Sequence, residues 1–387
     1  MTLTQVGAAL RLLALGTGIA LIGSPWSGAP ELGALLMLAV LAAQPRRFGV
    51  KSPVLVGLLA VWLGMSVLWS VMPGGTLRAA IRTTLVLVVA ALLAQTLRWR
   101  QITAAMALGG SILCGLALLW LVVNPAAATS SEGLQGMMAH NNSLGYLAAV
   151  ATVSTLLAHG LPTLIRLPLA VLSVVTLLLT ESMTSLLAAL LAIFVTAVLL
   201  LVRGLPGRVR AAASVLVLGV LGSAAYLVAF VPFATLIGRD TTLTGRTDIW
   251  PEVFRVANRH WLTGWGHGAP WLRGSWIREW AHYRFNFPMQ TAHNALLENY
   301  LQLGVVGVVL VVLLWALAIR RVLTAAAITG QGGWLLAMIV LHLVHGLAEA
   351  TQGASLCWLI VGMVWLARPS RPGVAELPSA GARRAAG

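Results

Sequence analysis

The sequence predicts an all-α integral membrane protein, and its composition and charge pattern support this class. Of the 387 residues, 59% are hydrophobic and only 9% are charged, whereas about a quarter of the residues in a soluble domain carry a charge. Long stretches without Asp, Glu, Lys or Arg recur along the chain, and positive charges gather in alternate connections between them. These features exclude a soluble globular protein, so the bilayer must be taken as the solvent.

The uncharged stretches have the length of membrane helices. Crossing the hydrocarbon core takes about 20 apolar residues, and clusters of Pro, Gly and charged residues divide the chain at about this interval. We expect twelve helices, while a different division after Gly133 would give eleven or thirteen. The expected spans are 6–23, 31–43, 54–71, 80–97, 102–123, 143–159, 164–180, 183–202, 211–232, 295–319, 332–348 and 350–367.

The basic residues predict the orientation of these spans. If the N-terminus is cytoplasmic, the inner loops and the C-terminal tail hold most of the 25 Lys and Arg residues and a single acid, Glu376. This asymmetry follows the positive-inside rule, so the net charge of +15 reports topology and not nucleic-acid binding. The basic residues concerned are Arg46, Arg47, Lys51, Arg98, Arg100, Arg166, Arg203, Arg208, Arg210, Arg320, Arg321, Arg368, Arg371, Arg383 and Arg384.

Four regions follow from this topology. Residues 1–238 hold nine transmembrane helices, 239–293 form a long outer loop, 294–367 hold three more helices, and 368–387 form a disordered cytoplasmic tail. The first apolar run contains Arg11 and lacks a convincing cleavage site, so we expect no signal peptide. The 2 cysteines, Cys114 and Cys357, lie in apolar runs and are expected to be free.

The outer loop over 239–293 is unusual in composition. Structureless loops of this length are uncommon unless they carry a function. This loop holds four of the 8 histidines and six of the 15 tryptophans. It also holds arginines, namely Arg239, Arg246, Arg255, Arg259, Arg273, Arg278 and Arg284. Indole faces stack on sugars and guanidinium groups bind phosphate oxygens in pairs, so the loop suits a glycan attached to phosphate. An interfacial belt of Trp, with Arg on lipid phosphates, is the alternative.

Part of this loop, from Asp248 to Arg259, can form a short amphipathic helix with Pro251 in its first turn. Outside the loop, Arg78 and Arg82 share one helix face because they lie four residues apart. The chain has no D-x-D, no H-E-x-x-H and no Gly-rich phosphate loop. We therefore expect no metal and no cofactor, and arginines would have to neutralise a diphosphate.

Further polar residues are expected near the outer face. The segment His140-Asn141-Asn142 precedes one expected span, and Glu181, Glu298 and Glu349 lie at or near the ends of others. Ionisable groups at such depths are costly and are functional candidates by default. For the three acids, internal Arg–Glu pairs that lock the bundle are the alternative.

Four stretches carry a resemblance to a known family. Their order and the position of the loop match as well, and the resemblance extends from about residue 60 to 365. The stretches are W-S-x-x-P at 69–73 with Arg78; H-N-N-S-L-G at 140–145; G-R-D-T-T-L-T-G-R-T-D-I-W at 238–250 with L-T-G-W-G-H-G-A at 262–269; and H-N-A-L-L-E at 293–298 with L-G-V-V-G at 303–307. Together they resemble the O-antigen ligase and polysaccharide polymerase superfamily.

The resemblance implies a membrane-embedded, GT-C-like glycosyltransferase of the bacterial inner membrane. Its donor would be an undecaprenyl-diphosphate-linked oligosaccharide on the periplasmic side, and its acceptor a glycan or lipid A-core. Polysaccharide assembly proteins would be further partners, and nucleic acid would not. The family's loop arginine corresponds to Arg246, and the histidine before the next helix corresponds to His293. The chain departs from the family at Met183, where Arg or Lys is frequent, so Arg78 or Arg82 would supply that diphosphate contact.

These inferences give a hypothesis for the site. His293 would act as the general base on the acceptor hydroxyl, and Arg246 would stabilise the leaving diphosphate, with inversion at the anomeric carbon. Glu298 would orient the imidazole of His293. The other candidate diphosphate ligands are Arg78, Arg82, Arg239 and Arg255, and the candidates for glycan binding or orientation are His140, Asn141, Asp248, Trp265, His267, Trp271 and Glu298.

Several functions remain open within this hypothesis. The 140–145 and 238–250 segments favour an exopolysaccharide polymerase over an O-antigen ligase, and a protein-glycosylating transferase is a third acceptor class. A transporter or lipid flippase is the alternative from another class. Midplane charges and broken, repeated helices would favour a transporter, but the charges of this chain cluster at the outer face.

Overall fold

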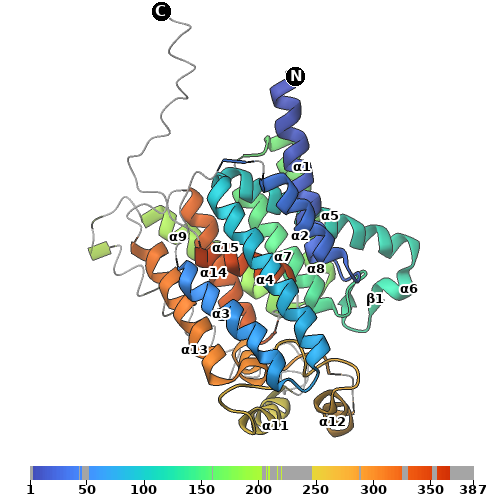
Figure 1. Ribbon diagram of the computed structural model, residues 1–387. Coiled ribbons are helices and arrows are strands. Elements are labelled where there is room, and N and C mark those ends of the chain that lie inside the picture. Colours follow the sequence, from blue (N-terminus) through green and yellow to red (C-terminus); the bar gives the residue numbers. More distant parts are fainter. Residues whose placement is uncertain are drawn as a thin grey trace, which may run out of the picture.

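The protein is a helical bundle (Figure 1), seen here in a computed structural model. The structure describes residues 3–42, 44–45, 52–158, 160–202, 206, 208–209, 216, 219, 246–286, 289–324, 330–350 and 355–366. A small antiparallel hairpin, β1 (Thr129–Ser130) and β2 (Gly133–Leu134), is the one sheet among these residues. The helices are α1 (Leu3–Gly23), α2 (Ala29–Ala42), α3 (Pro53–Met65), η1 (Ser66–Trp69), α4 (Pro73–Thr96), α5 (Trp99–Val123), α6 (Pro125–Ala128), α7 (Asn141–Leu157), α8 (Thr163–Leu179), α9 (Met183–Val202), α11 (Arg246–Asn258), α12 (Trp276–Phe285), α13 (Ala295–Thr324), α14 (Gly330–Gly346) and α15 (Ser355–Leu366).

The predicted fold class, an all-α membrane protein, is confirmed. A helix lies over every expected span except 211–232, which falls almost entirely outside the described residues. Among the described residues, 5 helices are long and apolar enough to cross a membrane, namely α1, α4, α5, α9 and α13. The apolar helices α2, α3, α8, α14 and α15 are shorter. The count of twelve spans and the limits of the loop therefore stay predictions, and the expected tail over 368–387 lies outside the described residues.

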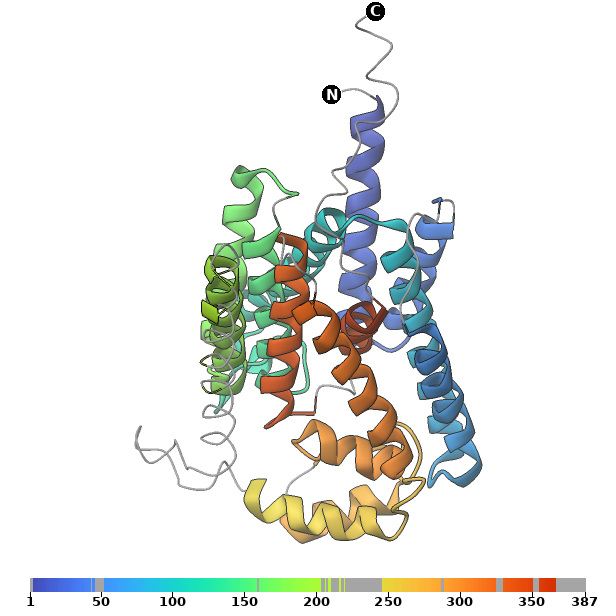
Figure 2. The ribbon, with the colours of Figure 1, turned by 90° about the vertical axis from the view of Figure 1, so that its left-hand side faces the viewer.

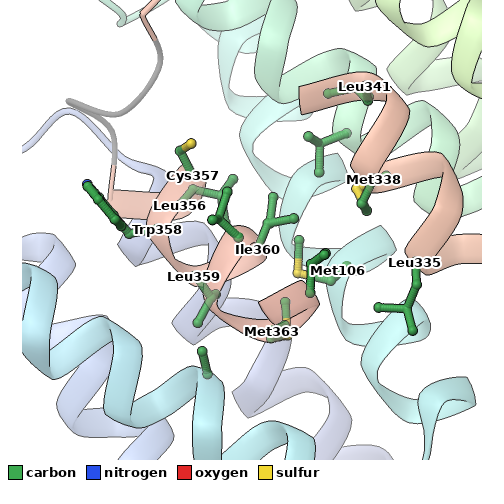
Figure 3. Close-up of a cluster of buried hydrophobic side chains, with 14 of the residues drawn as sticks. Met106, Leu335, Met338, Leu341, Leu356, Cys357, Trp358, Leu359, Ile360 and Met363 are labelled. Atoms are coloured by element: carbon green, nitrogen blue, oxygen red, sulfur yellow. The ribbon is translucent and has the colours of Figure 1, made fainter. Parts of the chain in front are cut away.

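Three helices form the centre of the bundle. All twelve residues of α15 are buried, and most of α7 and of the described side chains of α14 are buried as well. A helix that is apolar all round has no solvent-facing side and belongs inside a larger protein. Side chains of α14 and α15 pack there with Met106 of α5 (Figure 3). Both Cys114 and Cys357 are buried and free, as expected.

The helices of the long loop lie at one end of the bundle. In Figures 1 and 2, α11 and α12 lie together at the end opposite to the start of α1. The short amphipathic helix predicted for this loop is confirmed as α11. It begins at Arg246, however, so Pro251 lies beyond its first turn. Its buried residues Ile249, Val253, Val256 and Ala257 recur at helical spacing. They form a second hydrophobic cluster with α12 and the start of α13.

The helix α13 is broken at Gly304, in the third turn from its start. Gly304 has φ 66° and ψ −168°, so the helical hydrogen bonds around it cannot form. The loop segment 261–266 replaces them with its own backbone. Trp265 N donates to Leu301 O (2.9 Å), Gly266 N to Gln302 O (2.9 Å), and Val305 N to Trp261 O (2.8 Å). Backbone groups that face lipid or a dry interior need such partners.

Two tryptophans from the first half of the chain stabilise the junction between loop segment 261–266 and the break in α13. The indole of Trp62 in α3 donates to Leu303 O (3.0 Å), and the indole of Trp69 donates to Thr263 O (3.0 Å). Their rings pack together, with centroids 5.1 Å apart. The loop is therefore held between α3 and the broken part of α13, and its path over the end of the bundle is set by these contacts.

Two glycines make this close approach feasible. Gly264 and Gly304 both have positive φ, 71° and 66°. A Cβ atom at either position would come closer than 3.0 Å to backbone atoms of the other segment. An L-residue there would meet both a conformational penalty and a backbone clash.

We expect Gly304→Ala to lower the free energy of unfolding by more than about 2 kcal/mol. The measurement is thermal unfolding of the detergent-solubilised protein. Gly57→Ala in α3 is the matched control, because nothing lies within 4 Å of its added Cβ. That control should be neutral or slightly stabilising, and equal stability of both variants would contradict this account of the junction.

Candidate functional site

His293 occupies a strained position just before α13. Its φ is +49°, a conformation that non-glycine residues rarely adopt. The turn is fixed from both sides. Thr291 Oγ1 accepts from His293 N (3.3 Å), and Asn294 Oδ1 caps α13 by accepting from the amides of Leu296 and Leu297 (3.0 Å each). Strain of this kind persists only where the surroundings impose it, and it is common at functional sites.

The imidazole of His293 binds a buried carboxyl group. Its Nδ1 lies 3.1 Å from Oε2 of Glu349, which follows α14 and is 6% exposed. The ring itself is partly exposed, and its Nε2 makes no hydrogen bond to any described residue. The acid that orients this ring is therefore Glu349, and not Glu298 as the sequence suggested. Glu298 lies one turn into α13 and uses its oxygens elsewhere.

A chain of polar side chains continues from Glu349 into the bundle. Asn142 Nδ2 donates to Glu349 Oε1 (2.6 Å), and Ser182 Oγ donates to Asn142 Oδ1 (2.6 Å). Ser182 Oγ lies 2.9 Å from Ser185 Oγ, which lies 3.1 Å from Nε2 of His345. These groups come from the starts of α7 and α9 and from the end of α14. Sequence analysis named Asn142 and Glu349 without assigning them a role, and it missed His345.

The neighbours His140 and Asn141 lie beside this chain and hold the β hairpin in place. Asn141 is buried, and its Nδ2 donates to Glu132 O (2.7 Å) and Thr180 O (3.0 Å). His140 Nδ1 accepts from Asn142 N (3.2 Å), and its Nε2 lies 3.4 Å from Glu132 Oε2. The expectation that these two residues bind glycan stays a prediction; in the structure they join the hairpin to the end of α8.

A second polar network lies under the loop, with Glu298 at its centre. Oε1 of Glu298 accepts from Trp271 Nε1 (2.7 Å) and from Gln302 Nε2 (2.5 Å). Its Oε2 accepts from the amide of Ala292 (2.6 Å), which directly precedes His293. Glu298 thus fixes the backbone next to the histidine and does not touch its ring. Sequence analysis did not single out Gln302.

The same network binds His267. Its Nδ1 lies 3.1 Å from Gln302 Oε1, and its Nε2 lies 2.9 Å from Thr83 Oγ1 in α4. Burial lowers the pKa of His267 to about 4, against a smaller opposing effect of the Gln302 hydrogen bond. The imidazole is therefore neutral at pH 7.

The roles in glycan binding or orientation expected for His267 and Trp271 stay predictions. The two residues are 5% and 9% exposed, and both lie within the network of Glu298 and Gln302. Trp265 is partly exposed, and its indole nitrogen donates to Val256 O (3.0 Å). The centroid of its ring lies 3.8 Å from that of His260, with the two planes tilted by 37°. A sugar-binding role for Trp265 stays a prediction.

The expected diphosphate ligands differ in whether an acidic side chain already pairs with them. Arg82 forms an ion pair with Glu31 (2.6 Å), whereas Arg78, one turn earlier, is exposed and has no partner among the described residues. Arg255 is exposed and pairs with Glu252 (2.9 Å). Asp248 is exposed in the first turn of α11, where an acid is favoured by the helix dipole.

Two of the expected ligands lie wholly or partly outside the described residues. Arg246 begins α11, but its side chain and all of Arg239 lie outside the described residues. Met183, which replaces a basic residue of the family, is the first residue of α9 and is 49% exposed. No group of His, Cys, Asp and Glu residues among those described could hold a metal ion.

Comparison with known proteins identifies one region of the chain. Residues 168–312 match a protein-family model described as O-antigen ligase. No curated protein matches the chain. The matched region contains Ser182, Arg246 and His293, while Asn142 and Glu349 of the same site lie outside it.

Because His267 stays neutral when buried, acid should destabilise the fold. The unfolded chain takes up a proton near pH 6.5, but the folded protein resists until about pH 4. Stability is therefore fully present above pH 6.5 and falls between pH 6.5 and 4, by up to about 3 kcal/mol. We expect the unfolding temperature to fall less steeply between pH 7 and pH 5 in His267→Gln than in the wild type. His282→Gln, at an exposed position, should keep the wild-type slope, and an unchanged slope in His267→Gln would refute the assignment.

Proposed function

We propose that the protein is a glycosyltransferase of the bacterial inner membrane, because residues 168–312 match the family model described as O-antigen ligase. It transfers a glycan from undecaprenyl diphosphate to an acceptor hydroxyl on the periplasmic side. Both termini are cytoplasmic in this proposal. The end of the bundle that carries α11 and α12 then faces the periplasm, opposite to the start of α1.

The observation that supports this function best is the hydrogen bond between His293 and Glu349. The carboxylate holds Nδ1, so the partly exposed Nε2 is left for a substrate. A histidine held in this way can remove a proton from a hydroxyl group near neutral pH. A structural ion pair would not require the strained φ of +49° at the histidine.

The reaction needs a base and a positive environment for the leaving group. His293 takes the proton of the acceptor hydroxyl as its oxygen bonds to the anomeric carbon, and the bond to the diphosphate breaks with its electron pair. Arg246 and the exposed Arg78 stabilise the diphosphate as its charge develops. Arg82 is the weaker candidate because Glu31 already neutralises it. Arg239 and Arg255 are further candidates. A single displacement of this kind inverts the anomeric centre and needs no metal.

We favour a polysaccharide repeat-unit polymerase over an O-antigen ligase. The basis is the resemblance of the 140–145 and 238–250 segments to the exopolysaccharide polymerase branch. The two reactions differ in the acceptor, which is a lipid-linked glycan for a polymerase and lipid A-core for a ligase.

The broken helix α13 raises the transporter alternative, because transporters bind ions at unwound helices. In this protein the backbone groups at the break already have hydrogen-bond partners. Leu301 O, Gln302 O and Leu303 O accept from the loop backbone and from Trp62, and Val305 N is bound as well. The break therefore positions the loop, which favours the glycosyltransferase over the transporter.

The direct test uses the purified protein in nanodiscs with an undecaprenyl-diphosphate-linked oligosaccharide. Longer lipid-linked glycans on a gel would support the polymerase. Glycan transferred to added lipid A-core would support the ligase, and a wild-type protein that produces neither would refute the proposal.

We expect His293→Ala to lower the rate of transfer by about 10²- to 10⁴-fold, the usual contribution of a general base. The variant should still fold, because the side chain is partly exposed. Transfer is measured by the same assay, with thermal unfolding as the check on folding. His282→Ala, on the exposed side of α12, is the matched control and should retain full activity. A folded His293→Ala protein with normal product would remove the histidine from the mechanism.

Arg246→Ala should lower turnover by about 10²- to 10³-fold, as the loss of one group that stabilises developing charge usually does. Arg246→Lys should restore only part of this loss, because Lys keeps the charge but cannot bind two oxygens at once. Arg273→Ala, at an exposed loop position, controls for the loss of a positive charge. Full activity of the lysine variant would argue against paired phosphate binding.

A further inference from the structure

We propose that Glu349 is the positioning residue of the reaction and that Asn142 and Ser182 hold it in place. This inference rests on the proposed function, since it assigns the catalytic His293 the hydrogen-bond partner that orients its ring. Glu349 lies 56 residues beyond His293 in sequence and outside the region matched to the O-antigen ligase family.

The two oxygens of Glu349 have separate partners. Oε2 lies 3.1 Å from Nδ1 of His293, and Oε1 accepts from Asn142 Nδ2 at 2.6 Å. A carboxylate has two acceptor oxygens, whereas the side-chain amide of Gln or Asn has one. With Nδ1–H of His293 as the donor, both hydrogen bonds can therefore be kept only if residue 349 carries a carboxylate. A Gln could keep both contacts only by donating to Nδ1 of the other tautomer.

The series of hydrogen bonds that ends at Glu349 has a defined order of donors and acceptors. Ser182 Oγ donates to Asn142 Oδ1 at 2.6 Å, which leaves Nδ2 of Asn142 as the donor to Glu349. Asn142 belongs to the first turn of α7, and Ser182 directly precedes α9. The carboxylate is thus held by groups on two helices that pack against each other, and it cannot rotate without breaking these bonds.

A second tie joins the two segments that carry His293 and Glu349. Asn294 Nδ2, next to the histidine, donates to Leu347 O (3.0 Å), two residues before Glu349. Asn294 Oδ1 caps α13 in the same geometry. The backbone is therefore fixed at both ends of the His293–Glu349 contact, so this contact is built into the fold.

This arrangement sets the tautomer of the histidine. Because a carboxylate can only accept, Nδ1 of His293 carries the hydrogen, and the lone pair of the neutral ring lies on Nε2. In the reaction Nε2 takes the proton of the acceptor hydroxyl, while the Nδ1 proton stays on the ring and binds Glu349. The imidazolium formed is then stabilised by the carboxylate until it releases the Nε2 proton to water.

The test compares Glu349→Gln with Glu349→Asp and with an unrelated acid. Glu349→Gln should lower kcat by about 10²-fold or more, because wrong positioning of a catalytic histidine costs at least this much, and KM for the lipid-linked donor should change little. Glu349→Asp keeps the carboxylate and should recover part of the rate. Glu279→Gln, at an exposed position in α12, should be as active as the wild type.

A measurement on the ring distinguishes positioning from a general loss of structure. In protein labelled with ¹⁵N-histidine, the signal of His293 is the one that disappears in His293→Ala. In the wild type at neutral pH it should show the Nδ1–H tautomer, and in Glu349→Gln it should move toward a mixture of tautomers. Asn142→Ala and Ser182→Ala should each lower kcat by about tenfold, and they supply the test if Glu349→Gln does not fold.

The outcomes separate this inference from the proposed function. If the wild type transfers glycan and folded Glu349→Gln is equally fast, Glu349 has no positioning role and the proposed function stands. If the wild type transfers nothing, the function fails, but the tautomer measurement still decides whether Glu349 controls the ring. An unchanged His293 signal in Glu349→Gln would overturn the inference.

Discussion

The break in α13 at Gly304 is the feature on which the rest of this end of the bundle depends. A membrane helix cannot leave its backbone groups without partners, and here the partners come from loop residues 261–266 and from Trp62. The loop is thereby fixed against α3 and α13. Gln302, whose carbonyl accepts from Gly266 N at this junction, donates its side-chain amide to Glu298. Glu298 in turn accepts from Ala292 N, so hydrogen bonds connect the junction to the backbone next to His293.

The site is built from the ends of helices that are distant in sequence. Residues 142, 182, 293 and 349 meet where α7, α9 and α13 begin and α14 has just ended. The same ends face the side of the bundle where α11 and α12 lie (Figure 2).

The sequence predicted the helices well because apolar runs and charge clusters set their limits locally. It also brought out His293 and the H-N-N segment, whose residue types suit the chemistry. It could not predict the pairing of His293 with Glu349 in place of Glu298, because this depends on how α13 and α14 pack. The burial of Trp271 and His267 was missed for a similar reason. A Trp or His enriches the composition of a loop equally whether it faces a substrate or is buried. Here Trp271 binds Glu298 and His267 binds Gln302.

The candidate site extends beyond the region that matches the O-antigen ligase family model. Residues 168–312 contain Ser182 and His293, but the group between them in the hydrogen-bond chain, Asn142, and the acid on the ring, Glu349, lie before and after it. The junction at Gly304 likewise needs Trp62 of α3. The contacts Ser182–Asn142, His293–Glu349 and Leu303–Trp62 cross from the matched region to residues outside it. Residues 168–312 alone would therefore leave His293 without its acid and α13 without part of its support. The fold of the whole bundle is thus a condition for the geometry of the site.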